Sequence, residues 1–104
     1  MEQAVIVYLL LNDGQFGTSK ERASILALED RLEQVVGNAS VGEFDGDEFG
    51  DGKCILYMYG PDAERLFVVI EPVLKSSPAA VGGYAIKRFG KAADSSAREV
   101  RITW

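Results

Sequence analysis

Short strand-like runs and two longer helix-like runs alternate along this chain of 104 residues, and their order limits the folds open to it. Residues 4–11 are rich in Val, Ile, Leu and Tyr and precede Asn12-Asp13-Gly14, which predicts a buried strand and then a turn. Runs that predict four further strands occupy residues 41–44, 53–59, 84–89 and 98–104. Helix-like segments separate the first strand from the second, and the third from the fourth.

The first helix is expected to run from Thr18 to about Val36. The stretch from Thr18 to Glu21 fits the capping-box pattern, in which the Thr18 hydroxyl accepts a backbone N–H and Glu21 reaches back. Glu29 falls outside the apolar stripe of this helix, and Gly37 predicts a left-handed stop. The stripe itself comprises Ile25, Leu28, Leu32 and Val35.

The second helix is expected after Gly60, with Pro61 at its first position and Asp62 in its first turn. Apolar residues cover more than half of its circumference. Pro72 lies inside this pattern, where it removes a backbone donor and disfavours helical dihedral angles at Glu71. We therefore expect a kink or an early end at Pro72.

The resulting order, β-α-β-β-α-β with one additional C-terminal strand, is typical of an α+β fold. Its usual form is the ferredoxin-like plait, a four-stranded antiparallel sheet with both helices on one face. Crossovers of the usual hand place the first and third strands in the centre. The last strand would extend the sheet or pair with a second subunit. The length and the 47% of apolar residues fit one domain over residues 1–104.

The segment with the most unusual composition is GEFDGDEFGDG, residues 42–52, which contains four glycines and five acids. We expect it to form a wet hairpin turn or an acidic surface that contacts a basic protein. The five acids are Glu43, Asp45, Asp47, Glu48 and Asp51. A bound cation and a catalytic carboxyl pair are alternatives. The EF-hand template fails, because Phe49 and Leu56 occupy its fifth and twelfth positions, and we assign no metal ligand, catalytic residue or cofactor.

Alternation along the third strand separates two sets of side chains. The purely apolar set, which we expect to pack against the helices, comprises Cys54, Leu56 and Met58. The open-face set comprises Ile55, Tyr57 and Tyr59, joined by Tyr8 of the first strand. Two layers bury only one face of a sheet, so an aromatic second face predicts a homodimer formed sheet against sheet. A ligand-binding floor and simple exposure remain alternatives.

Residue types that are scarce in the chain exclude several kinds of chemistry. There is no histidine, which excludes Ser-His-Asp and Cys-His catalysis and histidine-ligated metals. The single cysteine, Cys54, has no intrachain partner and is expected to be a small buried hydrophobe. The longest apolar run has eight residues, far short of the roughly 20 that span a bilayer. We expect a cytoplasmic protein without a membrane partner.

Charge is distributed unevenly, and the net value is −5. The acidity argues against nucleic acid as a partner. An RNA-recognition sheet shares the expected topology, but the third strand lacks its aromatic core motif. Basic residues gather near the C-terminal end, where we expect them to protect solvated edge strands from aggregation. These are Lys87, Arg88, Lys91, Arg98 and Arg101. Alternation puts Lys87 and Arg88 on opposite faces, and packing is the expected role of Trp104.

Residues 42–67, GEFDGDEFGDG followed by KCILYMYGPDAERLF, resemble the central block of small uncharacterised bacterial proteins of similar length. This resemblance implies a bacterial cytosolic α+β domain. It implies no activity and assigns no functional residue.

Two functional hypotheses follow from these observations. The leading one is a non-catalytic protein-binding or regulatory module that contacts a basic partner through its acidic hairpin. The alternative is a small enzyme or small-ligand binder that uses carboxylates and tyrosines in a cleft at a dimer interface. The alternative predicts a concave pocket near Glu43, Asp45 or Tyr57.

Overall fold

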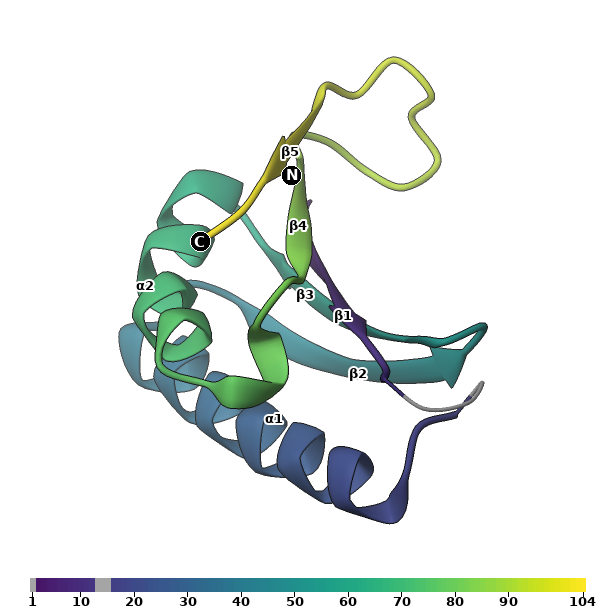
Figure 1. Cartoon of the computed structure of the whole chain (residues 1–104). Coiled ribbons are helices and arrows are strands. Elements are labelled where there is room, and N and C mark those ends of the chain that lie inside the picture. Colours follow the sequence, from purple (N-terminus) through teal and green to yellow (C-terminus); the bar gives the residue numbers. More distant parts are fainter. Residues whose placement is uncertain (1, 13–15) are drawn as a thin grey trace.

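The computed structural model describes residues 2–12 and 16–104, within which five strands and two α-helices form (Figure 1). The elements are β1 (Gln3–Leu10), α1 (Ser19–Ala39), β2 (Glu43–Gly50), β3 (Lys53–Gly60), α2 (Ala63–Lys75), the 3-10 helix η1 (Pro78–Ala80), β4 (Tyr84–Arg88) and β5 (Glu99–Ile102). The α+β class and the predicted order of elements are confirmed. The turn expected at Asp13-Gly14 lies outside the described residues.

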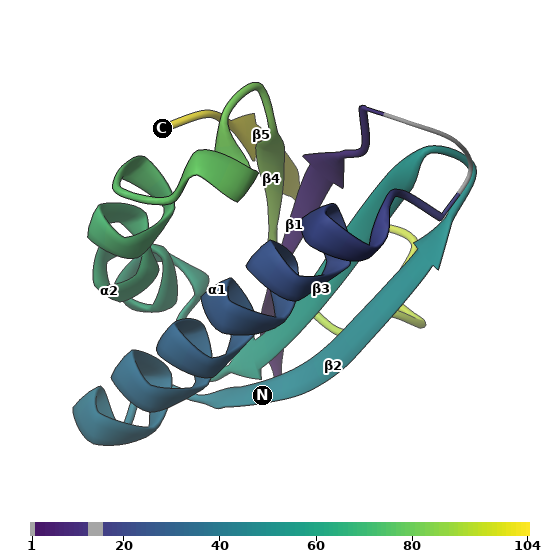
Figure 2. The same cartoon turned by 60° about the horizontal axis from the view of Figure 1, so that its bottom comes forward.

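All five strands belong to one antiparallel sheet with the order β2-β3-β1-β4-β5. β1 is the central strand and β3 lies beside it, as predicted. β5 extends the sheet beyond β4. Both helices cover the same face, and α1 crosses diagonally in front of the sheet in Figure 2. The opposite face carries no helix.

The core lies between this sheet and the two helices. Every second side chain of β1 and β3 points into it, and the predicted separation of the β3 side chains is confirmed. On the helix side, the fully buried residues of these strands are Val5, Val7, Leu9, Cys54, Leu56 and Met58, while Ala4 is buried on the opposite face. The residues on the helix side pack against Leu28 and Leu32 of α1 and Leu66 and Ile70 of α2. Burying each large side chain stabilises the fold by about 1.5–3 kcal/mol.

The start of α1 has the predicted capping box. The amide of Glu21 donates to Thr18 Oγ1 at 3.1 Å, and the amide of Thr18 donates to Glu21 Oε1 at 3.0 Å. The predicted stop at Gly37 is wrong, because the helix continues to Ala39. Ser40 takes the left-handed conformation instead, with φ 55°, and its amide donates to the carbonyl of Gly37 at 3.2 Å.

The acidic segment is mostly strand, where a turn was predicted soon after Phe44. β2 runs to Gly50, and only Asp51-Gly52 forms the turn, with φ 52° and 75°. Two successive positive φ angles are typical of a two-residue hairpin turn. The register shifts between Phe44 and Gly46, so Asp45 is the extra residue of a β-bulge.

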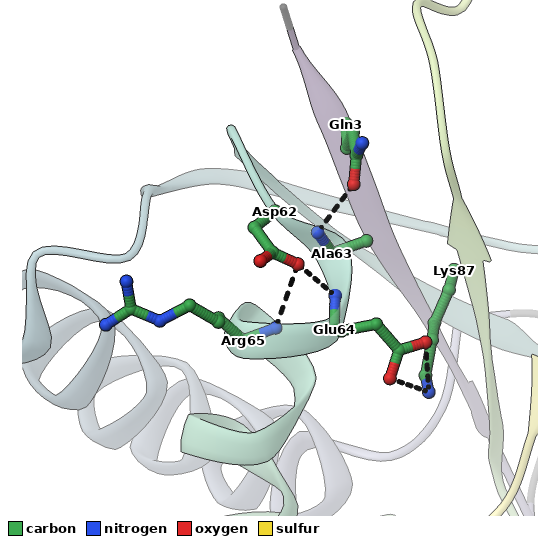
Figure 3. Close-up of polar contacts among 6 residues, drawn as sticks. All are labelled: Gln3, Asp62, Ala63, Glu64, Arg65 and Lys87. Carbon is green, nitrogen blue, oxygen red and sulfur yellow. Dashed lines mark hydrogen bonds and ion pairs between the residues drawn. The ribbon is translucent and has the colours of Figure 1, made fainter.

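The start of α2 differs from the prediction, because its first residue is Ala63 and not Pro61. Asp62 caps the helix, and its Oδ1 accepts from the amides of Glu64 at 3.0 Å and Arg65 at 3.3 Å (Figure 3). Pro61 therefore precedes the cap. The amide of Ala63 donates to Gln3 Oε1 at 2.8 Å, which joins the start of α2 to β1.

Trp104, which follows β5, contacts η1 and the residues that lead into β4. Its Nε1 donates to the carbonyl of Ala80 at 3.2 Å. The ring also contacts the backbone at Gly83, where an added Cβ would lie 3.1 Å from Trp104 Cζ2. The side chain packs against the core, as the sequence predicted.

Of the kink or early end predicted at Pro72, the early end is wrong, because the helix passes Pro72 and reaches Lys75, and the kink stays a prediction. The Pro72 side chain is exposed, while Ile70, Val73 and Leu74 around it are buried. Tertiary packing therefore offsets the cost of a proline inside the helix.

Replacement of Pro72 should reveal that cost. Pro72→Ala is expected to raise the free energy of unfolding by about 1–3 kcal/mol, because alanine restores the backbone donor and little packing is lost. Urea denaturation measures the change. Pro61→Ala, which lies outside the helix, serves as the control and should change stability by less than about 0.5 kcal/mol. A Pro72→Ala protein less stable than the parent would contradict this explanation.

Candidate functional site

The acids of residues 42–52 lie at a free edge of the sheet, because β2 is its first strand and pairs only with β3. All five acids, Glu43, Asp45, Asp47, Glu48 and Asp51, are exposed. No basic residue interrupts the segment. Charged side chains and a bulge on an edge strand oppose unspecific pairing with other chains. The edge therefore favours a partner whose charge is complementary.

The register divides these acids between the two faces of the sheet. Glu43 pairs with Tyr59 and Glu48 pairs with Ile55, which places both glutamates on the open face. Asp47 pairs with Leu56 and therefore lies on the face covered by the helices. The five acids share an edge and do not form one patch.

Asp47 meets Glu29 of α1, a residue that the helical pattern had placed outside the buried stripe. The side chain of Glu29 is buried, at 8% exposure, and shares a hydrogen bond with Asp47. Its Oε2 atom is buried without a hydrogen-bond partner among the described residues. Burial above all, and then Asp47, raises the pKa of Glu29 to about 8. The carboxyl group of Glu29 thus carries a proton at neutral pH and donates the hydrogen bond to Asp47.

Cys54 of β3 lies close to this carboxyl pair. Burial, followed by the charges of Asp47 and Glu29, raises the pKa of its thiol to about 12. A thiol that stays protonated is a poor nucleophile. The geometry agrees with a packing role for Cys54.

The carboxyl pair predicts a pH-dependent stability. The folded protein keeps a proton on Glu29 up to about pH 8, whereas the unfolded chain releases it near the ordinary value of 4.5. Stability must therefore fall as the pH rises between these two values. Glu29→Gln, which cannot ionise, is expected to raise the free energy of unfolding by roughly 1–3 kcal/mol at about pH 9 and to change it little near pH 4.

Urea denaturation across this pH range measures the difference. Glu2→Gln, an exposed glutamate outside this cluster, is the control and should retain the pH dependence of the parent protein. If the free energy of unfolding of Glu29→Gln falls with pH as steeply as that of the parent protein, the pair does not carry the proton.

Aromatic side chains line the open face of the sheet. Tyr8 stacks on Tyr84 of β4, with 4.7 Å between ring centroids and 11° between ring planes. The Tyr57 hydroxyl donates to Glu48 Oε1 at 3.4 Å. The residues expected on this face, Tyr8, Ile55, Tyr57 and Tyr59, do lie there, each half-buried. Sequence reasoning missed Tyr84, whose signal was its place at the start of the fourth strand.

Two basic residues expected to be solvated are buried instead. Lys87 is 7% exposed, and its Nζ lies 3.1 Å from Glu64 Oε1 on the helix face (Figure 3). Arg88 is 8% exposed and points to the open face, where its Nε donates to the carbonyl of Gly90 at 2.8 Å. Their opposite directions follow the predicted alternation. Arg101 of β5 also lies on the open face, 3.8 Å from the centre of the Tyr84 ring.

An open depression of about 680 Å³ lies where β2 begins and β3 ends. Glu43 and Tyr59 of the predicted sites line it, together with Ser40. Gly42 and Gly60 also line it, and their backbones lie so close that a Cβ on Gly42 would collide with the Tyr59 carbonyl and one on Gly60 with that of Val41. The depression thus depends on two glycines that admit no side chain.

Residues 2–12 and 16–104 contain no group of three or more Cys, Asp or Glu side chains placed to hold a metal ion. Neither α1 nor any other helix within these ranges is long and apolar enough to cross a membrane.

Comparison with models of known protein families gives no match for this chain. Comparisons with curated proteins and with solved structures likewise find no significant similarity.

Proposed function

We propose that the protein is a ferredoxin-like, non-catalytic binding module of the bacterial cytoplasm, which contacts a basic protein through the acids of β2. The first four strands are ordered β2-β3-β1-β4 under two helices on one face, which supports the ferredoxin-like plait. A regulator of a basic enzyme is the kind of role that such a module performs.

The position of β2 at the sheet edge is the observation that carries this proposal. The outer edge of β2 offers backbone donors and acceptors for an added strand, and exposed acids flank them. An extended basic segment could pair with the backbone while its Lys and Arg side chains meet the carboxylates. The bulge at Asp45 interrupts regular pairing, so the segment would lie along residues 46–50.

A basic strand-forming peptide of alternating lysine and threonine tests the proposal. NMR titration should shift the amide signals of β2 more than those of β5, because only β2 presents an acidic edge. Binding should weaken strongly between about 0.1 and 0.5 M salt, since screening shortens the reach of exposed charges. A peptide of alternating glutamate and threonine should not bind.

Paired substitutions locate the interaction. Asp45→Asn with Asp51→Asn removes two charges from the hairpin and should weaken peptide binding, whereas Glu33→Gln with Glu71→Gln removes two from the helices and should leave it unchanged. Equal affinities of the two proteins, or binding that salt does not affect, would refute a specific acidic edge.

The depression beside Glu43 favours a second candidate function, the binding of a small cationic ligand. Glu43 and Glu2 would face the charge, and the Tyr59 ring would cover an alkyl chain. An alkyl diamine is a suitable probe, and titration should shift the signals of Ser40 and Tyr59. Glu43→Gln should abolish these shifts, whereas Glu33→Gln should not. Absence of any shift in the parent protein would remove this candidate.

A further inference from the structure

Charge is separated across the open face of the sheet. Glu43 and Glu48 stand on β2 at one edge. Toward the other edge stand Arg101 on β5 and the buried Arg88 on β4, with one acid, Glu99, between them. Half-buried apolar and aromatic side chains fill the middle, so the face has an acidic side, an apolar centre and a basic side. The central residues are Ile6, Tyr8, Ile55, Tyr57, Tyr84 and Ile86.

Such a face is complementary to a second copy of itself in one orientation. Consider a two-fold axis that runs parallel to β1, directly above the open face. It lays a second sheet on the first with the order of its strands reversed. The acidic β2 of one copy then lies against the basic β5 of the other, and the reverse contact forms by symmetry. An axis perpendicular to the strands would place β2 on β2, with four glutamates together, which like-charge repulsion disfavours.

The register makes the pairing specific. Gly46, Tyr57, Ile6, Ile86 and Arg101 form one rung across the sheet. Under this axis Ile6 meets Ile6 of the second copy, and Arg101 comes opposite Gly46, between Glu48 and Glu43. Glu99 would approach Glu43, so this rung opposes the pairing, and Arg88 is the one cation on the same rung.

The loop at residues 90–98 supplies further contact. It leaves the sheet on the side away from the helices, at the end where β4 stops and β2 begins (Figures 1 and 2). A turn inside the loop is held by Asp94 Oδ1, which accepts from the amide and hydroxyl of Ser96 at 2.9 and 2.6 Å. In the paired arrangement the loop of one copy carries Lys91 toward Glu43 of the other.

The size of the face is compatible with stable association. Three strands of eight residues, one of five and one of four, about 4.8 Å apart and rising about 3.3 Å per residue, present roughly 500 Å² before side-chain relief is counted. A standard interface buries about 800 Å² per partner, and the projecting loops add to the area.

We propose that a second copy of this chain covers the open face, with the two-fold axis parallel to β1 and each β2 against the other copy's β5. This interface uses the face of the sheet, whereas the basic partner proposed above uses its outer edge. The two proposals can therefore fail independently.

Light scattering with size-exclusion chromatography gives the first test. The parent protein is expected at twice the chain mass of 11.3 kDa. Ile6→Glu places a charge at the centre of the face and should yield a folded monomer, with folding checked by circular dichroism. Leu26→Glu, at a 54% exposed site on α1, is the matched control and should remain a dimer. A parent monomer at the highest attainable concentration, or a dimer that Ile6→Glu leaves intact, would overturn the proposal.

A charge exchange tests the direction of the axis. Arg101→Glu alone and Glu48→Lys alone should each raise the dimer dissociation constant by about tenfold or more. The double variant restores opposite charges across the interface and should recover most of the parent affinity. Failure of the double variant to recover would rule out this axis, even if the open face is the interface.

Discussion

The pairing of β1 with two neighbours places every other part of the molecule. β1 is bonded to β3 on one side and β4 on the other, and its alternate side chains Val5, Val7 and Leu9 are fully buried beneath the helices. β2 and β5 attach only to this central group. Gln3 of the same strand also holds the first turn of α2. Because β1 offers both of its edges and one complete face to the core, the outer strands remain free to carry charge.

Two ionisable side chains are buried at the boundary between the sheet and the helices, and their charges are compensated in different ways. Lys87 enters under α2 and meets the carboxylate of Glu64, so a buried cation has a partner of opposite sign. Glu29 enters over β2 and meets Asp47, a group of the same sign. A proton must replace the missing cation there, and the association of α1 with β2 consequently depends on the acidity of the solvent. The same layer therefore has one contact between opposite charges and one between two carboxyl groups that depends on pH.

The features predicted from sequence are those with a local cause. The capping box at Thr18 and the sidedness of β3 depend on residues a few positions apart, and both were confirmed. The length of β2 was missed because its glycines and acids have little strand propensity and the strand exists by pairing with β3. The burial of Glu29 was missed for a related reason: it requires knowledge of where β2 lies over α1. Glu29 does follow Ile25 by one helical turn, and that spacing was the only signal available.

The contact between Trp104 and Ala80 has a spectroscopic consequence. Trp104 is the only tryptophan of the chain, and its indole rests on η1 beyond the last strand. Intrinsic fluorescence of this protein would therefore report the seating of β5 and its tail on the core, and would respond weakly to events at β2 on the far edge of the sheet. Two signals would therefore distinguish two events. A red-shift of the indole emission would report detachment of β5, and a change in far-ultraviolet ellipticity would report loss of the whole fold.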